Sequence, residues 1–157
     1  MRAVLQVTKK SSVLCEGAVV SQCGKGMCIL LGLGDGDTKE IADKVIQKIL
    51  KMRIFTDNQG KLNLSAVDVE ADILVVSNFT LYANLSSRRP DFLKAMKFGP
   101  AKELYEYFME KMQAEANLLA TPGGKSAKIF PGVFGGDMIV EITGDGPVTI
   151  LVDSEDL

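Results

Sequence analysis

The stretch Gly26–Leu33 reads GMCILLGL, a continuous apolar run bounded by glycines, which is typical of a strand buried on both faces. The turn residues Gly34–Gly36 interrupt this run. Asp37, with Glu40 three positions later, resembles a capping box at the start of a helix. Apolar residues then recur at helical spacing, namely Ile41, Val45, Ile49 and Met52. The pattern therefore predicts a buried strand followed by a helix over residues 38–52.

The segments before and after this unit add further strands. Residues 1–8 predict a first strand, and residues 13–20 predict a hairpin whose apolar arms flank a turn at Glu16–Gly17. A second turn is predicted at residues 57–60 (DNQG). Residues 72–82 (DILVVSNFTLY) predict a strand whose C-terminal end is polar.

The C-terminal half predicts a second helix and two closing strands. A loop is expected at 86–90, and Gly99–Pro100 precedes a helix with an apolar stripe made of Leu104, Tyr105, Phe108, Met112 and Ala116. After a loop over 121–125, strands are expected near 137–143 and 148–153, joined through Asp145, Gly146 and Pro147. Residues 1–157 thus predict a single α+β domain, with strands in hairpins and two main helices packed on the sheet.

The absence of histidine restricts the chemistry more than any other feature of the composition. None of the 157 residues is histidine, which excludes Ser-His-Asp and Cys-His catalysis, histidine metal sites and a histidine general base. The formal net charge of −2 provides no overall basic field, so any contact with nucleic acid must rest on a local patch.

The cysteines and the N-terminal sequence indicate a cytosolic protein. Cys15, Cys23 and Cys28 lack CxxC spacing and lie in or beside apolar segments, so we expect buried free thiols and a reducing compartment. The N-terminal residues lack the long apolar region of a secretory signal, and the run Met27–Leu33 is too short to span a bilayer.

Three segments are candidates for function, and each has a purely structural alternative. Ser77–Thr80 places hydroxyl and amide groups at the end of an apolar strand, which suits a pocket floor with exposed N–H groups but also suits an ordinary polar strand end. Arg88–Arg89, with Lys94 and Lys97 nearby, is either a solvated face or a phosphate-binding patch. Gly146–Pro147 is either a tight turn or a functional loop.

Six ordered segments together give a resemblance that covers the chain nearly end to end. They are MRAVLQ at 1–6, MRIFTDNQGKLNLS at 52–65, ILVVSNFTLYA at 73–83, RRPDF at 88–92, FGGDM at 134–138 and GDGPVT at 144–149. In these segments the sequence resembles the D-aminoacyl-tRNA deacylase (D-tyrosyl-tRNA deacylase) family. The resemblance implies an α+β fold with a mainly antiparallel, barrel-like sheet and two main helices, assembled as a homodimer with its active sites at the subunit interface.

The resemblance also implies an activity and its substrate. Members of this family hydrolyse the ester that joins a D-amino acid, or glycine mischarged on tRNA-Ala, to the 3′ end of tRNA. They thereby proofread chirality in translation by sterically rejecting L-amino acids. Aminoacyl-tRNA and a second copy of the chain are the implied partners, and no cofactor, metal or membrane is implied.

The family motifs map onto specific residues of this chain. Ser77, Asn78, Phe79 and Thr80 match the catalytic Ser-Gln-x-x-Thr segment, whose backbone N–H groups would stabilise the oxyanion while the terminal 2′-hydroxyl of the tRNA activates or orients water. Thr80 is either a nucleophile or, without an adjacent base, a group that positions the ester or the water. Gly146 and Pro147 match the chirality-selecting Gly-cisPro motif, supported by Gly144, Val148 and Thr149.

The expected contacts with tRNA come from the first motif, from the FGGDM segment at 134–138 and from the basic cluster. Phe79, Phe134 and Met138 are candidates for an apolar slot around the terminal adenine, and Arg88 and Arg89 are candidates for phosphate contacts.

Three residues depart from the family pattern. Asn78 replaces a usual Gln, Gly144 replaces a usual Asn, and Val7 replaces an Arg that supports the Gly-cisPro loop. Two alternatives therefore stay open at this point: a relative that edits L-alanyl-tRNA, and a catalytically weakened homologue that binds tRNA or DNA. The sequence leaves open whether the Gly146–Pro147 bond is cis or trans.

Overall fold

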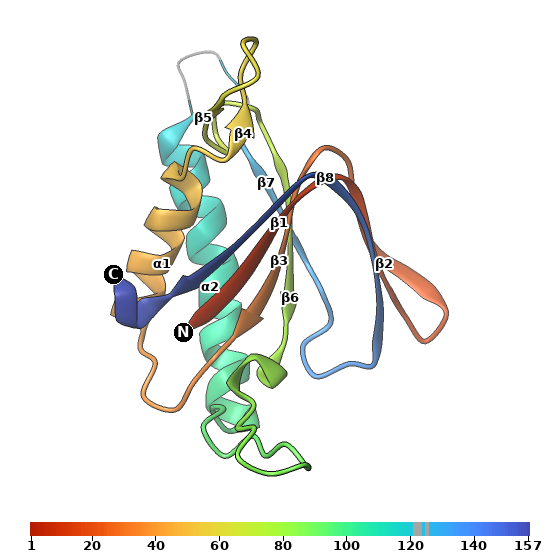
Figure 1. The fold of residues 1–157 in the computed structure, drawn as a ribbon, viewed down its shortest axis with the longest axis vertical. Coiled ribbons are helices and arrows are strands. Elements are labelled where there is room, and N and C mark those ends of the chain that lie inside the picture. The colour runs from red at the N-terminus through yellow and green to blue at the C-terminus, as the bar shows by residue number, and fades with distance from the viewer. Residues whose placement is uncertain (121–123, 125) are drawn as a thin grey trace.

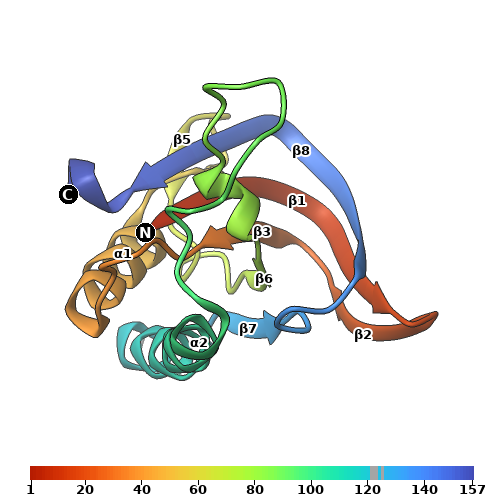
Figure 2. The ribbon, with the colours of Figure 1, turned by 90° about the horizontal axis from the view of Figure 1, so that it is seen from below.

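The protein is built on one curled sheet with two helices on its outer face (Figures 1 and 2). The computed structural model describes residues 1–120, 124 and 126–157. The sheet has the strand order β2-β1-β3-β6-β7, and β8 pairs with β1 as well. The strands are β1 (Arg2–Cys15), β2 (Ala18–Cys23), β3 (Gly26–Gly32), β6 (Asp72–Ser77), β7 (Lys128–Pro131) and β8 (Met138–Asp153).

The pairing within this sheet is mixed. β1 runs antiparallel to β2, β3 and β8, whereas β3–β6 and β6–β7 are parallel pairs. Figure 2 shows the sheet curling into an incomplete barrel. The prediction of an α+β fold with two main helices is confirmed, but the sheet is less uniformly antiparallel than expected because two connections contain helices, which link parallel strands.

The two helices cover the main hydrophobic core. Both α1 (Lys39–Lys51) and α2 (Phe98–Leu119) follow strands that lie in the centre of the sheet. The stripe predicted on α2 is fully confirmed, because all five of its residues are buried, and Ala101 joins them. The predicted strand at 26–33 is confirmed as β3, whose residues Met27, Ile29 and Leu31 are buried in the same core.

The start of α1 differs from the predicted capping box. Thr38 is the N-cap, and its hydroxyl accepts a hydrogen bond from the Ile41 N–H. Asp37 instead accepts from the Gly34 N–H at 2.6 Å and from the ammonium group of Met1 at 2.5 Å. The capping box was therefore a wrong prediction, because Asp37 ties the preceding turn to the start of β1.

The beginning of α2 also differs. The helix starts at Phe98 and includes Gly99 and Pro100 in its first turn. Proline is tolerated there because the first N–H groups of a helix have no intrahelical acceptor.

The predicted hairpin at Glu16–Gly17 is confirmed, whereas the prediction of two separate strands joined through residues 145–147 is wrong. Both Glu16 and Gly17 have positive φ (51° and 78°) between β1 and β2. β8, in contrast, continues through Pro147 as one long strand, since both of its halves pair with β1. β1 likewise continues to Cys15 instead of ending at residue 8.

The remaining elements are short. β4 (Phe55–Thr56) and β5 (Leu62–Leu64) form a small ribbon around the predicted turn at 57–60. The strand expected over 72–82 ends at Ser77, and η1 (Phe79–Tyr82) is a 3₁₀ turn; η2 (Ser154–Asp156) follows β8. Apart from Gly124, the loop expected at 121–125 lies outside the described residues. Among the described helices, none combines the length and apolarity required to cross a membrane.

Candidate active site

An open, largely apolar cavity of about 910 Å³ lies at the end of β6. Ser77–Thr80 form part of its wall, and residues from the 92–98 and 134–138 segments complete much of the rest. Among the lining residues, all of which belong to the described chain, Asp137 alone is charged. Such a cavity suits an apolar group accompanied by a few polar contacts.

Hydrogen bonds fix the backbone of the Ser77–Thr80 segment. The Asn78 N–H donates to the Leu31 carbonyl at 2.7 Å, which attaches the segment to the end of β3. The Asn78 side chain then caps η1: its Oδ1 accepts from the Thr80 N–H at 3.2 Å and from the Thr80 hydroxyl at 2.5 Å. Within the described residues the Phe79 N–H has no acceptor, so it is the available donor among the N–H groups of Asn78, Phe79 and Thr80.

Aromatic rings form two walls of the cavity. Phe79, which is 57% exposed, packs edge-on against Phe92 with ring centroids 4.9 Å apart. Phe98 and Phe134 form a second edge-on pair at 5.3 Å. Such pairs prefer this geometry and hold both rings in place.

A turn positions Met138 at the cavity. Its Sδ atom accepts a hydrogen bond from the Val133 N–H at 3.2 Å. Gly135 in the same turn has φ of +70°, and an added Cβ atom would lie 2.5 Å from the Phe98 ring, so glycine is required there. The structure thus brings Phe134 and Met138 into one cavity with Phe79, as the sequence analysis expected of an apolar slot.

The buried thiols near this region are uncharged. Burial raises the pKa of Cys28 to about 12, and the nearby Cys23 adds to this effect. Burial, with a contribution from the charge of Asp72, raises the pKa of Cys23 to about 11. All three cysteines are free, with Cys15 only partly buried. A buried thiol that stays protonated at neutral pH is a poor nucleophile, so Cys23 and Cys28 are structural residues.

The Gly146–Pro147 segment forms a bulge on β8. Gln6 pairs with Thr149 and Thr8 pairs with Gly144, so Val7 alone faces the four residues 145–148. The Gly146–Pro147 bond is cis, and both residues are exposed. Gly146 has φ of +127°, and a Cβ atom there would lie 2.6 Å from the Val148 nitrogen, so glycine is required.

Apolar packing and strand pairing support this bulge, because Val7 stands where the family pattern has a supporting arginine. Val7 is buried in the main core, and Val148 packs against that same core. Lys9 Nζ and Asp145 Oδ1 lie 3.9 Å apart, but Lys9 is exposed and Asp145 is partly exposed, and such solvent-accessible pairs contribute little to stability. Gly144 and Thr149 flank the bulge as the residues that resume pairing with β1.

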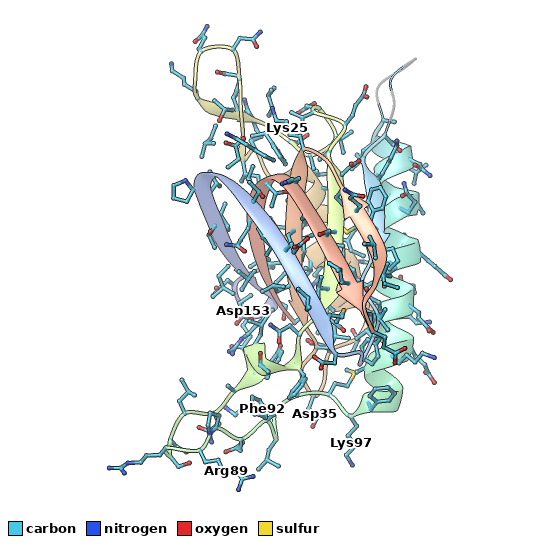
Figure 3. All side chains as sticks on the ribbon, turned by 90° about the vertical axis from the view of Figure 1, so that its right-hand side faces the viewer. Lys25, Asp35, Arg89, Phe92, Lys97 and Asp153 are labelled. Atoms are coloured by element: carbon cyan, nitrogen blue, oxygen red, sulfur yellow. The ribbon has the colours of Figure 1, made fainter. Side chains whose placement is uncertain are left out.

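The bulge and the Ser77–Thr80 segment lie at opposite ends of the sheet, although the cavity also extends along β8 to Ile142. Thr8 pairs with both Gly144 and Gly26, and Gly26 pairs with Asp72, the first residue of β6. Ser77 is the last residue of β6, which places it roughly 16 Å further along the sheet. Figure 3 shows this separation: Lys25, beside Gly26, is at one end, whereas Phe92 and Lys97 are at the other. The structure therefore does not bring the two motifs together within one chain.

The basic cluster lies on a loop beside the cavity. Asn84 and Asp91 close this loop through backbone hydrogen bonds of 2.8 and 3.2 Å and a side-chain hydrogen bond of 2.9 Å. Arg88 and Arg89 are exposed on it, and Figure 3 shows Arg89 extending from this end of the molecule. Neither arginine lines the cavity, but Phe92, at the base of the same loop, does.

Sequence reasoning missed Asp137, Phe92 and Phe98 as cavity residues. Asp137 lies within the FGGDM segment and Phe92 within RRPDF, so the segments were recognised without a role for these side chains. The exposed apolar ring of Phe98 gave no signal of its own, because its contact with Phe134 depends on the fold. Among the described residues, no three His, Cys, Asp or Glu side chains are grouped as a metal site.

Comparison with known proteins places this geometry in a family. Residues 4–153 match the model of the D-Tyr-tRNA(Tyr) deacylase family. The chain is 45% identical over 158 residues to D-aminoacyl-tRNA deacylase of Aquifex aeolicus, with all of both chains covered. It is 43% identical over 156 residues to D-aminoacyl-tRNA deacylase of Thermosipho melanesiensis, covering 99% of this chain and 98% of the relative.

Two solved structures share the fold of this chain. A structure named c-Myc DNA Unwinding Element Binding Protein superposes with a TM-score of 0.86 and 37% identity, covering 98% of each chain. A probable eukaryotic D-amino acid tRNA deacylase has a TM-score of 0.76 at 19% identity, covering 96% of this chain and 97% of the other, which is a likeness of fold. With its whole length matched, the chain belongs to the D-Tyr-tRNA(Tyr) deacylase family.

Proposed function

We propose that this protein hydrolyses the ester bond of D-aminoacyl-tRNA and releases the free D-amino acid and tRNA. The observation that carries the proposal is full-length similarity to D-aminoacyl-tRNA deacylases, combined with an open cavity bordered by Ser77–Thr80. The apolar walls suit an amino acid side chain or the terminal adenine, and the carboxylate of Asp137 suits the α-ammonium group of an aminoacyl ester.

The chemistry needs little from ionisable side chains. The chain has no histidine, and its two buried thiols are protonated at neutral pH. An aminoacyl ester is already activated and has a ribose hydroxyl beside it, so holding the ester, the water and that hydroxyl together contributes a large part of the catalysis. The 2′-hydroxyl of the tRNA takes the role of activating or orienting water.

The Phe79 N–H is the main-chain donor for the developing oxyanion. The Asn78 N–H already donates to Leu31 and the Thr80 N–H already donates to Asn78 Oδ1, whereas the Phe79 N–H is available at the cavity. Loss of one such donor typically costs ~10²–10³ in rate. Thr80 has no base beside it among the described residues, so its hydroxyl positions a reactant and does not attack the ester.

Selection against L-amino acids uses the Gly146–Pro147 bulge of a second copy of the chain. The bulge is exposed and lies at the opposite end of the sheet from Ser77–Thr80 of its own chain, so it reaches such a segment only across a subunit interface. A two-fold symmetric homodimer satisfies this requirement for both copies at once. Its proline then crowds the position of an L side chain and leaves a D side chain or glycine unhindered, which gives broad specificity among D-amino acids.

The loop of Arg88 and Arg89 provides the tRNA contact outside the cavity. Both guanidinium groups are exposed beside the aromatic wall, and contacts of this type bind phosphates without reading base sequence. Because the whole chain has a net charge of −2, this small patch gives a modest and salt-sensitive affinity.

The activity is tested by measuring the release of amino acid from D-tyrosyl-tRNA, L-tyrosyl-tRNA and L-alanyl-tRNA. We expect rapid deacylation of D-tyrosyl-tRNA and little of the two L-esters. Preference for L-alanyl-tRNA would identify an L-alanine-editing relative. Binding of tRNA or duplex DNA without turnover of any ester would indicate a binding protein, an outcome that the DNA-binding name of one structural neighbour makes worth testing.

The assembly is tested by the mass of the protein in solution. We expect sedimentation equilibrium to give twice the 17.0 kDa chain mass at micromolar concentration, because the bulge and the cavity that it serves belong to different copies. A stable monomer that still discriminates D- from L-tyrosyl-tRNA would contradict the shared site.

The role of the bulge is tested by the substitution Pro147→Ala. We expect the ratio of L- to D-tyrosyl-tRNA cleavage to increase roughly tenfold, because the ring that crowds an L side chain is removed. Pro100→Ala is the matched control, since Pro100 is also exposed but lies in the first turn of α2. Equal ratios for the two variants would remove the bulge from selection.

The phosphate-binding role of the arginines is tested by Arg88→Ala/Arg89→Ala. We expect weaker tRNA binding and a salt dependence whose logarithmic slope falls by about 0.7–0.9 for each phosphate that the protein no longer neutralises. Lys48→Ala/Lys51→Ala is the control, because it removes the same charge from exposed positions on α1, which does not line the cavity. Equal effects of both double variants would show that only net charge matters.

A further inference from the structure

Asn78 occupies a position from which it controls the hydrogen bonding of Thr80. Its Oδ1 atom accepts both hydrogen bonds that Thr80 is able to donate, one from the backbone N–H at 3.2 Å and one from the hydroxyl at 2.5 Å. A threonine hydroxyl carries one proton and two lone pairs. Once its proton is directed at Asn78, the hydroxyl has only acceptor capacity left.

The surroundings of this pair fix the conformation of Asn78. The Asn78 N–H donates to the Leu31 carbonyl and the Asn78 carbonyl accepts from the Leu81 N–H at 3.4 Å, so its backbone is fixed on both sides. The side chain is partly buried at the N-cap of η1, whereas Thr80 is exposed and lines the cavity. The lone pairs of Thr80 Oγ1 are therefore free at the cavity.

We infer that Asn78 is a positioning residue that fixes the Thr80 hydroxyl as a hydrogen-bond acceptor for a proton-bearing group of the substrate or the attacking water. This inference rests on the proposed deacylase function. It gives the two groups of the motif different roles. The Phe79 N–H donates to the acyl oxygen, and Thr80 Oγ1 accepts from an O–H or N–H group.

The arrangement has a consequence for the departure from the usual Gln. An Asn side chain reaches the N–H group two residues later and closes a short ring that a longer side chain does not form as readily. In this chain, therefore, the Thr80 N–H donates to the Asn78 side chain, which leaves the Phe79 N–H as the main-chain donor of this segment for the oxyanion.

The test compares Asn78→Leu, Thr80→Val and the double variant in deacylation of D-tyrosyl-tRNA. Leucine has a similar size but offers no acceptor. We expect each single variant to lower kcat/KM about tenfold, as is typical for loss of one positioned hydrogen bond, and the double variant to be no slower than either. Additive losses, or an unchanged rate in Asn78→Leu, would overturn the inference.

Two controls separate positioning from folding. Asn78→Ser restores a neutral side-chain oxygen that caps helices well, and we expect it to recover most of the activity lost in Asn78→Leu. Asn58→Leu makes the same change in an exposed turn far along the chain, and it should leave kcat/KM unchanged. Failure of the serine variant to exceed the leucine variant would contradict the acceptor role.

Amide hydrogen exchange tests the geometry independently of activity. We expect the Thr80 amide to exchange slowly in the wild type and in Asn78→Ser but rapidly in Asn78→Leu, while the Phe79 amide exchanges rapidly in all three. An inactive wild type with a protected Thr80 amide would refute the proposed function, and with it the reaction role of Thr80. An active wild type with an unprotected Thr80 amide would refute this inference alone.

Discussion

The long antiparallel pairing of β1 with β8 is the constraint on which the rest of the structure depends. β1 continues from Arg2 to Cys15 and β8 from Met138 to Asp153, so the pairing joins the N-terminal and C-terminal segments of the chain over nearly the whole length of both strands. Because the register is fixed on both sides of residues 145–148, these four residues protrude opposite Val7. The same register separates this bulge from the cavity at the end of β6.

The two functional segments differ in how they are held. The bulge relies on strand pairing and on Val7 and Val148 in the core, whereas the Ser77–Thr80 segment relies on hydrogen bonds at a strand end. A core fixes position through close packing, and a strand end leaves N–H groups and hydroxyls available to a ligand. A site of this kind suits the proposed ester hydrolysis by placement of groups, and burial keeps the thiols of Cys23 and Cys28 protonated.

Much of the fold was predictable from local pattern. The buried strand β3, both main helices, the turn at Glu16–Gly17 and the strand β6 follow from apolar periodicity and turn residues. The errors arose where a local signal has two structural meanings. Asp37 matched a capping box but binds the Met1 ammonium group. Residues 145–147 were expected to join two separate strands but form a bulge within β8, because in both cases the decisive partner is distant in the sequence.

The sequence by itself determined the family, the α+β class and the two motifs, because these depend on residue identities in order along the chain. Only the tertiary structure decided which side chains share the cavity, since Phe98, Phe92 and Asp137 meet there through contacts between separate segments. It also decided that Asn78 uses its side chain within its own segment and that the bulge lies away from Ser77–Thr80 of its own chain. Hydrogen-bond partners and strand register are set by packing in three dimensions, which a linear pattern does not specify.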